Sequence, residues 1–401
     1  MKNVVVVGGS LAGVNAAESL RERGYDGDIA ILSAEQDLPY DRPPLSKELL
    51  SGESTEDQLL LHPEQWYRDM DIDLRLGARA IGLDAGARIV RSDDGSEIRY
   101  DGLVIATGSR VKSLPSAIKA PRLHSIRTLA DVRALQPKLT AGRHMIVLGA
   151  GFIGLEAASV ARRFDMEVTV VQSSSLPLAR TFGGEVSRWY RNLHERNGVR
   201  FATDSAAASL SGDGPGTDTG TIAQLTNGAS VTGDIAVAGI GAKPAVDWLA
   251  GSGIELDDGV RCRPDLSTSL PDVVAAGDVA RWRNPAFDIE MRVEHWTNAV
   301  EQGRHAAGTL LGETAAFRSI PYLWSDQHGT KMRAIGHFSA GMEQRTVLKT
   351  DDKLVAVFGD GDVITGAVCV GSPRHLAQYK QAIANRMPWR EFHDELATVS
   401  M

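Results

Sequence analysis

The most constraining feature of this sequence is a pattern that occurs twice: an apolar run, a glycine-rich turn, a helical segment and a second apolar run. The first copy starts at residue 4 with its glycines at 8–13, and the second starts at residue 145 with its glycines at 149–154. Each copy has the length of a βαβ unit, about 30 residues. The glycines of such a unit allow a tight turn and let the backbone approach a pyrophosphate at the helix N-terminus. The sequence therefore predicts two dinucleotide-binding folds.

The two glycine motifs differ in quality. The second motif, at 149–154, is complete, whereas the first has Ser10 where the middle glycine belongs. A serine adds little bulk and can still lie near a phosphate, but it weakens the match. The motifs start at 8 and 149, so they are 149 − 8 = 141 residues apart, which is one domain length and not a tandem repeat. A single glycine motif is weak evidence, but two in the same strand–turn–helix context support each other.

An acidic residue about 20 residues after the glycine motif normally binds the ribose hydroxyls of the dinucleotide. The first unit offers Glu35, for which a solvated loop acid is an equally good interpretation. The second unit has Gln172 at this place, which can hydrogen-bond a ribose but lacks the charge that repels a 2′-phosphate. Residues 172–175 contain no arginine that would recruit such a phosphate. We therefore expect NADH as the preferred nicotinamide, with NADPH left open.

Composition excludes several classes of protein. The chain has 401 residues with a formal net charge of −8 and no block of like charges, so a general nucleic-acid-binding surface is not expected. No apolar run approaches the length of a membrane span, and Met1 leads directly into a strand-like run, so we expect a cytoplasmic protein without a membrane partner. The two cysteines, Cys262 and Cys369, lie far apart and form neither a disulfide framework nor a metal-ligand cluster.

Several short segments besides the glycine motifs have a specific character. They are PYDRPPLSK at 39–47, ATG at 106–108, RTL at 127–129, GIG at 239–241, AGD at 276–278, VEHW at 293–296 and WSDQ at 324–327. Together they cover nearly the whole chain in a fixed order. In this respect the sequence resembles the bacterial FAD-dependent ferredoxin reductases, which include putidaredoxin, rhodocoxin and biphenyl-dioxygenase ferredoxin reductases.

The resemblance implies a fold class and a domain organisation. The expected fold is α/β, with two Rossmann-like dinucleotide-binding domains as in the glutathione-reductase-like flavoproteins, followed by a C-terminal α+β domain. We expect a discontinuous FAD-binding domain at 1–110 and 244–320, an NAD-binding domain at 111–243 and the α+β domain at 321–401. The short alternating apolar segments after residue 340 and a helical stretch from about 375 to 386 agree with the last of these.

The resemblance also implies cofactor-binding residues. Those expected around FAD are Gly8, Ser10, Ala12, Gly13, Glu35, Arg42, Lys47, Ala80, Ala106, Thr107, Gly108, Arg127, Gly277, Asp278, Glu294, His295 and Trp296. Those expected around NAD are Gly149, Gly151, Ile153, Gly154, Glu156, Gln172, Arg180 and Gly241. Without the resemblance, Trp296 would be interpreted as a core aromatic. The chain departs from the family pattern at Ala245, where the family usually has asparagine.

Lys47 and Glu156 are the expected catalytic residues. By resemblance Lys47 lies close to the flavin ring, where an ammonium group favours the anionic reduced flavin, and Glu156 pairs with it. Another interpretation of Glu156 is a charge that complements the helix dipole in the first turn after the second glycine motif. His295 and His328 are interpreted as structural, because hydride transfer to a flavin requires no proton donor.

The absence of paired cysteines narrows the expected reaction. Disulfide-reducing flavoproteins need two neighbouring cysteines as an electron relay, and this sequence has none near either glycine motif. The electrons must therefore pass to an external acceptor, which by resemblance is a 2Fe–2S ferredoxin that serves a Rieske dioxygenase or a haem-thiolate monooxygenase. Alternatives are a rubredoxin reductase or a diaphorase-like NADH oxidase, and, more remotely, a signalling protein like apoptosis-inducing factor.

The candidate cations for docking the ferredoxin are Arg304, Lys331 and Arg333. A monomer or weak homodimer is expected.

Overall fold

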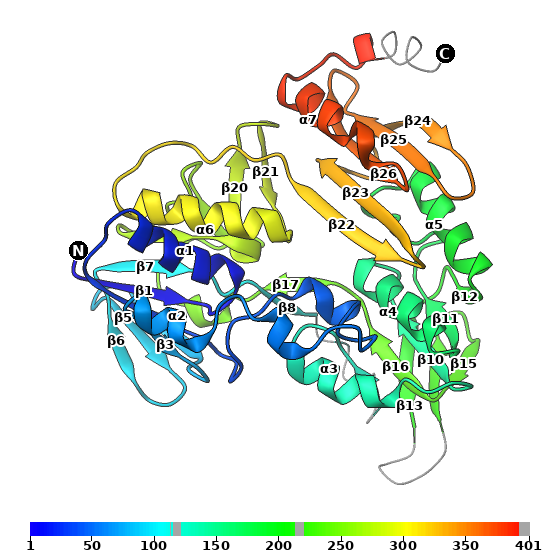
Figure 1. Cartoon of the computed structure of the whole chain (residues 1–401), viewed down its shortest axis with the longest axis horizontal. Helices are drawn as coiled ribbons and strands as arrows, with labels where there is room; N and C mark the ends of the chain where they lie inside the picture. Colours follow the sequence, from blue (N-terminus) through cyan, green and yellow to red (C-terminus); the bar gives the residue numbers. More distant parts are fainter. Residues whose placement is uncertain (113, 115–121, 213–219, 393–401) are drawn as a thin grey trace. The chain divides into compact units, whose positions relative to one another are not determined.

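A computed structural model describes residues 1–112, 114, 122–212 and 220–392 of the chain (Figure 1). The chain divides into two compact units, each built from three separate stretches. The first unit contains residues 1–41, 56–110 and 242–321, and the second contains 42–55, 111–241 and 322–401. None of the helices in the described ranges is long and apolar enough to cross a membrane.

The first unit is organised around a parallel sheet of five strands in the order β19-β7-β1-β2-β3. The strands are β1 (Asn3–Val7), β2 (Asp28–Leu32), β3 (Ile72–Arg75), β7 (Gly102–Ile105) and β19 (Val273–Ala275), and helix α1 (Leu11–Glu22) connects β1 to β2. Strand β1 lies in the middle of the sheet, and its residues 4–7 are all buried, which explains its unbroken run of valines. Because β19 pairs with β7, the chain returns to its first sheet after residue 241, and the stretch 111–241 is an insertion.

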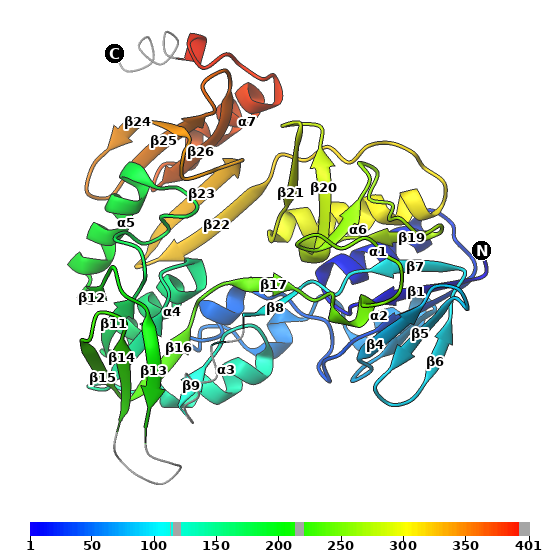
Figure 2. The ribbon, with the colours of Figure 1, turned by 180° about the vertical axis from the view of Figure 1, so that it is seen from behind.

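Smaller elements complete the first unit. An antiparallel sheet of β4 (Ala80–Asp84), β5 (Ile89–Ser92) and β6 (Glu97–Arg99) and a mixed sheet of β18 (Val260–Cys262), β20 (Ala280–Asn284) and β21 (Ile289–Arg292) accompany the main sheet. Helix α6 (Trp296–Leu310) packs against α1 (Figures 1 and 2). The remaining elements are the β8 (Ser109–Val111) and β17 (Ala242–Pro244) pair, and α2 (Glu64–Asp69).

The second unit contains the other parallel sheet, in the order β12-β11-β10-β16-β9. Its strands are β9 (Leu123–His124), β10 (His144–Leu148), β11 (Glu167–Val171), β12 (Val199–Ala202) and β16 (Ile235–Ala238), with helices α3 (Leu129–Leu135), α4 (Phe152–Arg163) and α5 (Gly184–Arg196). A three-stranded antiparallel sheet extends from it, formed by β13 (Ala207–Ser211), β14 (Thr221–Leu225) and β15 (Ser230–Gly233) (Figure 2). The order strand, glycine turn, helix, strand recurs here as in the first unit.

The C-terminal part of the second unit is an antiparallel sheet against which the last described helix packs. Its strand order is β22-β23-β26-β25-β24, with β22 (Tyr322–Gln327), β23 (Thr330–Gly336), β24 (Glu343–Lys349), β25 (Leu354–Gly359), β26 (Ile364–Val370) and helix α7 (Leu376–Ala384). Strand β22 packs against α4, which joins this sheet to the parallel sheet within one compact unit. The α/β fold class with a C-terminal α+β part is confirmed. A division into three domains with boundaries after 110, 243 and 320 stays a prediction, and residues 42–55 group with the second unit.

Candidate functional site

Both glycine turns are closed so tightly that the last glycine of each motif cannot carry a side chain. A Cβ built on Gly13 would lie 1.9 Å from Gly8 O, and one built on Gly154 would lie 2.3 Å from Gly149 O. These contacts are with backbone atoms, so a side chain could not be accommodated by a change of rotamer. The same steric constraint therefore operates in both units, each between a parallel strand and the helix that follows it.

The structure explains why Ser10 is tolerated in the first motif. Ser10 is the N-cap of α1 with an extended backbone, and Gly151 holds the equivalent place before α4. A Cβ on Gly151 would come no closer than 3.6 Å to Gly239 O, an ordinary van der Waals distance. The Ser10 side chain makes no capping hydrogen bond, and Gly151 has no side chain that could make one. The first N–H groups of both helices are thus left to bind an anion such as a pyrophosphate.

The FAD residues predicted in the first unit gather at the carboxyl edge of its parallel sheet. The glycine turn follows β1, Glu35 follows β2, the segment 106–108 follows β7 and Gly277 follows β19. In open parallel sheets this edge is where ligands bind. Ala80 lies apart from these four connections, at the start of β4.

Two carboxylates at this edge are held by neighbouring side chains. The Tyr40 hydroxyl donates to Glu35 Oε2 at 2.5 Å, and the Ser109 hydroxyl donates to Asp278 Oδ2 at 2.7 Å. Arg292 Nη1 donates to the backbone oxygen of Asp278 at 2.9 Å. Both carboxylates are therefore fixed in orientation before any ribose or ribityl hydroxyl reaches them.

The start of helix α6 carries the last group of predicted FAD residues. Trp296 Nε1 donates to Asp41 Oδ1 at 2.7 Å, and the exposed Glu294 accepts from Arg292 at 2.5 Å. Burial lowers the pKa of His295 to about 4, so its ring is neutral at pH 7. Within the described residues, His295 Nδ1 and Gln302 Nε2 are buried polar atoms that lack a hydrogen-bond partner.

These unpartnered atoms fit a polar cofactor in the first unit. The other side-chain atom of Gln302, Oε1, accepts from Gly277 N at 2.8 Å, which places the amide next to Asp278. A buried donor without a partner costs free energy, on the order of 1–3 kcal/mol, unless a ligand satisfies it. The polar edge formed by Glu35, Asp278 and Gln302 matches the hydroxyl-rich chain of FAD.

Three predicted FAD residues belong to the second unit. Arg42 Nη1 donates to Arg127 O at 2.6 Å, so these two residues are brought together. The backbone N–H of Arg127 donates to Asp131 Oδ2 at 2.8 Å, and Thr128 and Asp131 form the capping box of α3. Lys47 lies one turn after Arg42, at the end of the 3₁₀ helix Pro43–Ser46. Segment 42–55 thus carries cationic side chains on a short, hydrogen-bonded scaffold.

Lys47 and Glu156, the predicted catalytic pair, form a buried ion pair. Lys47 Nζ lies 3.0 Å from Glu156 Oε2, and their side chains are 11% and 3% exposed. The Ser46 hydroxyl also donates to Oε2, and the Ser325 hydroxyl donates to Oε1. The prediction that Glu156 lies in the first helical turn is wrong, because α4 begins at Phe152 and has no acidic residue in that turn. The charge of Lys47 and the hydrogen bonds from the two hydroxyls explain the buried carboxylate, whereas the helix dipole does not.

The predicted NAD residues surround the carboxyl edge of the second parallel sheet. Gln172 directly follows β11, and its side-chain oxygen and nitrogen are both buried without a partner among the described residues. Gly241 follows β16 with a φ of +95°, Ile153 at the start of α4 is 40% exposed, and Arg180 lies exposed in a turn. An amide with two unsatisfied groups at this edge fits the ribose of a nicotinamide dinucleotide.

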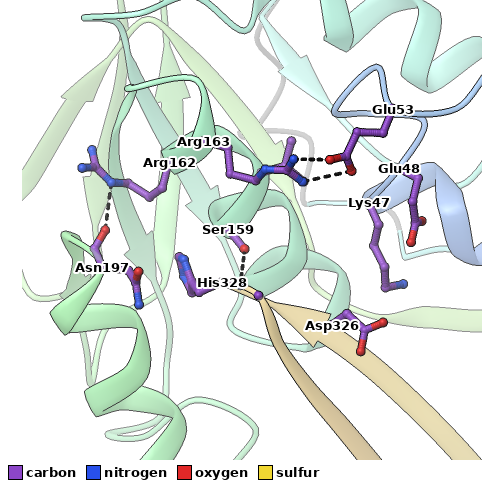
Figure 3. A pocket seen from close by; sticks show the side chains of 11 residues that line it. Lys47, Glu48, Glu53, Ser159, Arg162, Arg163, Asn197, Asp326 and His328 are labelled. Atoms are coloured by element: carbon purple, nitrogen blue, oxygen red, sulfur yellow. Dashed lines mark hydrogen bonds and ion pairs between the residues drawn. The ribbon is translucent and has the colours of Figure 1, made fainter. Parts of the chain in front are cut away.

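A pocket of about 660 Å³ opens beside the ion pair in the second unit (Figure 3). Lys47 lines it together with Ser159, Asp326 and His328. The Arg163 guanidinium, also in the wall, pairs with Glu53 of the segment 42–55. Lys47 therefore touches both the buried carboxylate and an open, polar cavity.

Neither cysteine is suited to relay electrons. Cys262 and Cys369 are both free and buried, and burial raises the pKa of each thiol to about 12. A thiol held in its neutral form is a poor nucleophile. The two dinucleotide folds therefore come without a reactive thiol.

The candidate docking cations have different surroundings. Arg304 Nη2 lies 3.3 Å from Glu18, and Arg333 Nη1 lies 2.9 Å from Asp326. Lys331 is exposed on β23. Because Arg304 and Arg333 share their charge with acids of their own units, the docking hypothesis for them stays a prediction with a weaker electrostatic basis.

Several residues of the site were missed in the sequence. Tyr40, Asp41 and Ser109 orient predicted residues, and the first two lie inside the quoted PYDRPPLSK segment. Ser325 lies inside the quoted WSDQ segment, so position in a recognised motif was the available signal.

Two parallel sheets, each with a glycine turn between a strand and a helix, define a two-dinucleotide oxidoreductase fold. Residues 2–303 match the family model described as pyridine nucleotide-disulphide oxidoreductase, and 322–395 match one described as reductase C-terminal. The chain belongs to the pyridine nucleotide-disulphide oxidoreductase family and is an oxidoreductase. Membership implies FAD and NADH as cofactors.

Individual relatives confirm the resemblance to ferredoxin reductases. The anthranilate 1,2-dioxygenase system ferredoxin–NAD(+) reductase component of Burkholderia cepacia is 36% identical, and the alignment covers 93% of each chain. A rubredoxin–NAD(+) reductase of Pseudomonas putida is 32% identical over 90% of each. The reductase in a crystal structure of the covalent putidaredoxin reductase–putidaredoxin complex has a TM-score of 0.91 at 31% identity, covering 96% of this chain and 94% of that chain.

Proposed function

We propose that this chain is an FAD-dependent reductase that takes electrons from NADH and passes them to a 2Fe–2S ferredoxin. The ferredoxin would serve an oxygenase, either a Rieske dioxygenase or a haem-thiolate monooxygenase. We further propose a cytoplasmic location and a monomer or weak homodimer. Two names support the proposal: one relative is the ferredoxin–NAD(+) reductase component of an anthranilate dioxygenase system, and one similar structure is a reductase bound covalently to putidaredoxin.

One observation carries this function: two dinucleotide folds occur without a reactive cysteine. Members of the same family that reduce disulfides need a thiol pair to receive the electrons. Here both thiols are buried, free and held in their neutral form. Electrons that enter the protein from a nicotinamide must therefore leave it directly to an external acceptor.

The residues divide the work between the two units. FAD, when bound, would supply a hydride acceptor that can also release single electrons, which suits a one-electron iron–sulfur acceptor. In the first unit, Glu35 and Asp278 would hold its hydroxyl groups. In the second unit, Gln172 would hold the nicotinamide dinucleotide, and the N-terminus of α4 would bind its pyrophosphate. Lys47, held in place by Glu156, would present an ammonium donor to the reduced cofactor.

The proposal is tested by stopped-flow reduction of the purified flavoprotein. We expect NADH to bleach the flavin absorption and a 2Fe–2S ferredoxin to restore it on a second mixing. The variant Cys262→Ala/Cys369→Ala is the control, and it should transfer electrons as fast as the natural chain. Bleaching without reoxidation by any 2Fe–2S ferredoxin would contradict the proposed acceptor, and loss of transfer in the cysteine variant would contradict the direct route.

A second acceptor deserves the same assay because one relative is a rubredoxin–NAD(+) reductase. The predicted site residues would serve a rubredoxin or a diaphorase-like oxidase reaction equally well. Reoxidation by rubredoxin or by dioxygen at a rate above that of every 2Fe–2S ferredoxin would assign the chain to one of these alternatives.

Gln172 provides a separate prediction about the nicotinamide. Replacing Gln172 by glutamate should raise the preference for NADH over NADPH about tenfold, because a carboxylate repels the 2′-phosphate while it still accepts from a ribose hydroxyl. The measurement is the dissociation constant of each nucleotide from flavin reduction at increasing concentrations. Gln172→Met is the matched control, since it removes the amide without adding charge and should weaken both nucleotides alike. Equal effects of both substitutions on the NADH/NADPH ratio would refute the assignment.

A further inference from the structure

The carboxylate of Glu156 is the end point of a continuous chain of hydrogen bonds inside the second unit. Its Oε1 accepts from the Ser325 hydroxyl, and Ser325 Oγ accepts from Gln327 Nε2 at 2.9 Å. Gln327 Oε1 lies 2.7 Å from His194 Nε2, and His194 Nδ1 lies 3.0 Å from His328 Nε2. All of these side chains except His328 are buried.

The C-terminal sheet supplies most of this chain. Residues of β22 alternate between a buried and a half-buried face, so Ser325 and Gln327 share the buried face. His328 follows at once, and its backbone N–H donates to Ser159 Oγ of α4 at 2.7 Å. His328 and Ser159 both reach the pocket of Figure 3. The chain thus runs from His328, which lines the pocket, to the carboxylate that pairs with Lys47.

The direction of every bond follows from the negative charge at one end. A carboxylate only accepts hydrogen bonds, so the Ser325 hydroxyl must donate its one hydrogen bond to Glu156. Ser325 Oγ is then left as an acceptor, so Gln327 must present its NH₂ to Ser325. This orientation turns Gln327 Oε1 toward His194, whose Nε2 must carry a proton. A neutral imidazole has one N–H, so His194 Nδ1 accepts and His328 Nε2 donates.

Both histidines have the neutral state that this direction requires. Burial lowers the pKa of His194 to about 4. Burial, with His194 and Arg162 nearby, lowers the pKa of His328 to about 3. Each ring therefore carries one N–H at pH 7, and its position is a defined property of the chain.

The chain orients the carboxylate and does not conduct protons to it. The amide of Gln327 stands in the middle, and an amide can pass a proton only through an unfavourable tautomer. Aligned hydrogen bonds polarise one another, so a distant donor strengthens the bond at the carboxylate. The chain of hydrogen bonds therefore orients the Glu156 carboxylate and stabilises its negative charge.

We propose that Gln327 and His194 are positioning residues for Glu156, holding its carboxylate, through Ser325, in the orientation that pairs it with Lys47. The C-terminal sheet thereby becomes part of the machinery around the ion pair. The step from this orientation to electron transfer rests on the proposed function, in which Lys47 supports the reduced cofactor.

The position of each histidine proton tests the chain directly. Long-range ¹H–¹⁵N correlation spectra of the flavoprotein should show His194 and His328 both protonated at Nε2. In Glu156→Gln, the new amide should keep its oxygen toward Lys47 and Ser46 and turn its NH₂ toward Ser325. Ser325 would then donate to Gln327, the Gln327 amide would turn over, and both histidine protons should move to Nδ1.

Ser46→Ala is the matched control, because it removes a donor from the other carboxylate oxygen and leaves the chain intact. Both protons should stay on Nε2 in this variant. A proton on Nδ1 of either histidine in the natural chain would overturn the proposal. So would unchanged tautomers in Glu156→Gln, which would mean that the histidines are fixed by their packing alone. If Glu156→Gln fails to fold, the spectra of the natural chain and of Ser46→Ala still show whether both histidines are protonated at Nε2.

A kinetic measurement tests the positioning role. Gln327→Leu should slow flavin reduction by NADH at least about tenfold while the NADH dissociation constant stays unchanged, because only the orientation of the ion pair is lost. An unchanged rate constant would overturn the positioning role. The spectra need no nicotinamide, so a natural chain that NADH fails to reduce would refute the proposed function and leave the tautomer test standing.

Discussion

Replacing Gly154 by alanine is expected to slow the reduction of the flavin by NADH about a hundredfold, the effect typical of a misplacement of about 1 Å in a binding site. The new methyl group would lie 2.3 Å from Gly149 O, so the turn between β10 and α4 must open. The N-terminus of α4 would then move away from the pyrophosphate of the nicotinamide dinucleotide. Because Gly154 is not among the predicted FAD residues, the flavin absorption of the purified variant should be retained.

Two further glycine variants separate the causes. Gly341→Ala is the control for the substitution itself, since no described atom beyond its chain neighbours lies within 4 Å of the added Cβ, and it should behave as the natural chain. Gly151→Ala fits the fold at 3.6 Å from Gly239 O, so any weakening of NADH binding there reports the approach of the pyrophosphate. If Gly154→Ala is reduced by NADH at the rate of Gly341→Ala, the α4 turn does not bind the nucleotide.

The same turns show why so much of the fold follows from the sequence. At Gly13 and Gly154 an added Cβ would lie 1.9 and 2.3 Å from a backbone oxygen, so no other residue type fits there. The spacing of these glycines is therefore a steric requirement that is visible in the sequence. The valine run of β1 is similarly forced, because a central parallel strand is buried on both faces. Ser10 could depart from the motif because its position requires no left-handed backbone and leaves room for a side chain.

The site was less predictable because its polar contacts join distant segments. Glu156 meets Ser46 across 110 residues and Ser325 across 169, and no local pattern encodes such pairs. The partners of Gln327 include His194, a residue 133 positions earlier on a charged helix. The family resemblance identified Lys47 and Glu156, but it did not reveal which residues hold their side chains in place. Helix α4 also begins at Phe152, which placed Glu156 one turn deeper than the sequence suggested.

Replacing Lys47 by methionine should lower the free energy of unfolding by about 3 kcal/mol, because breaking a buried ion pair leaves an uncompensated charge. The Glu156 side chain is only 3% exposed and lies too deep to reach water. Its remaining donors, the hydroxyls of Ser46 and Ser325, supply no positive charge. The measurement is urea-induced unfolding of the flavoprotein in excess FAD, compared with the natural chain.

The converse substitution, Glu156→Gln, should lower the free energy of unfolding by less than Lys47→Met does. The two partners of the ion pair therefore differ in how much stability is lost when each is replaced. Lys47 lines the open pocket of Figure 3, so its ammonium can turn toward water when the carboxylate is gone. The double variant Lys47→Met/Glu156→Gln should regain most of the stability that Lys47→Met loses, because no charge is then left buried. If Lys47→Met costs no more than Glu156→Gln, then the carboxylate has another source of compensation. The chain of hydrogen bonds through Ser325 would be the first place to look for it, since it ends on the same carboxylate.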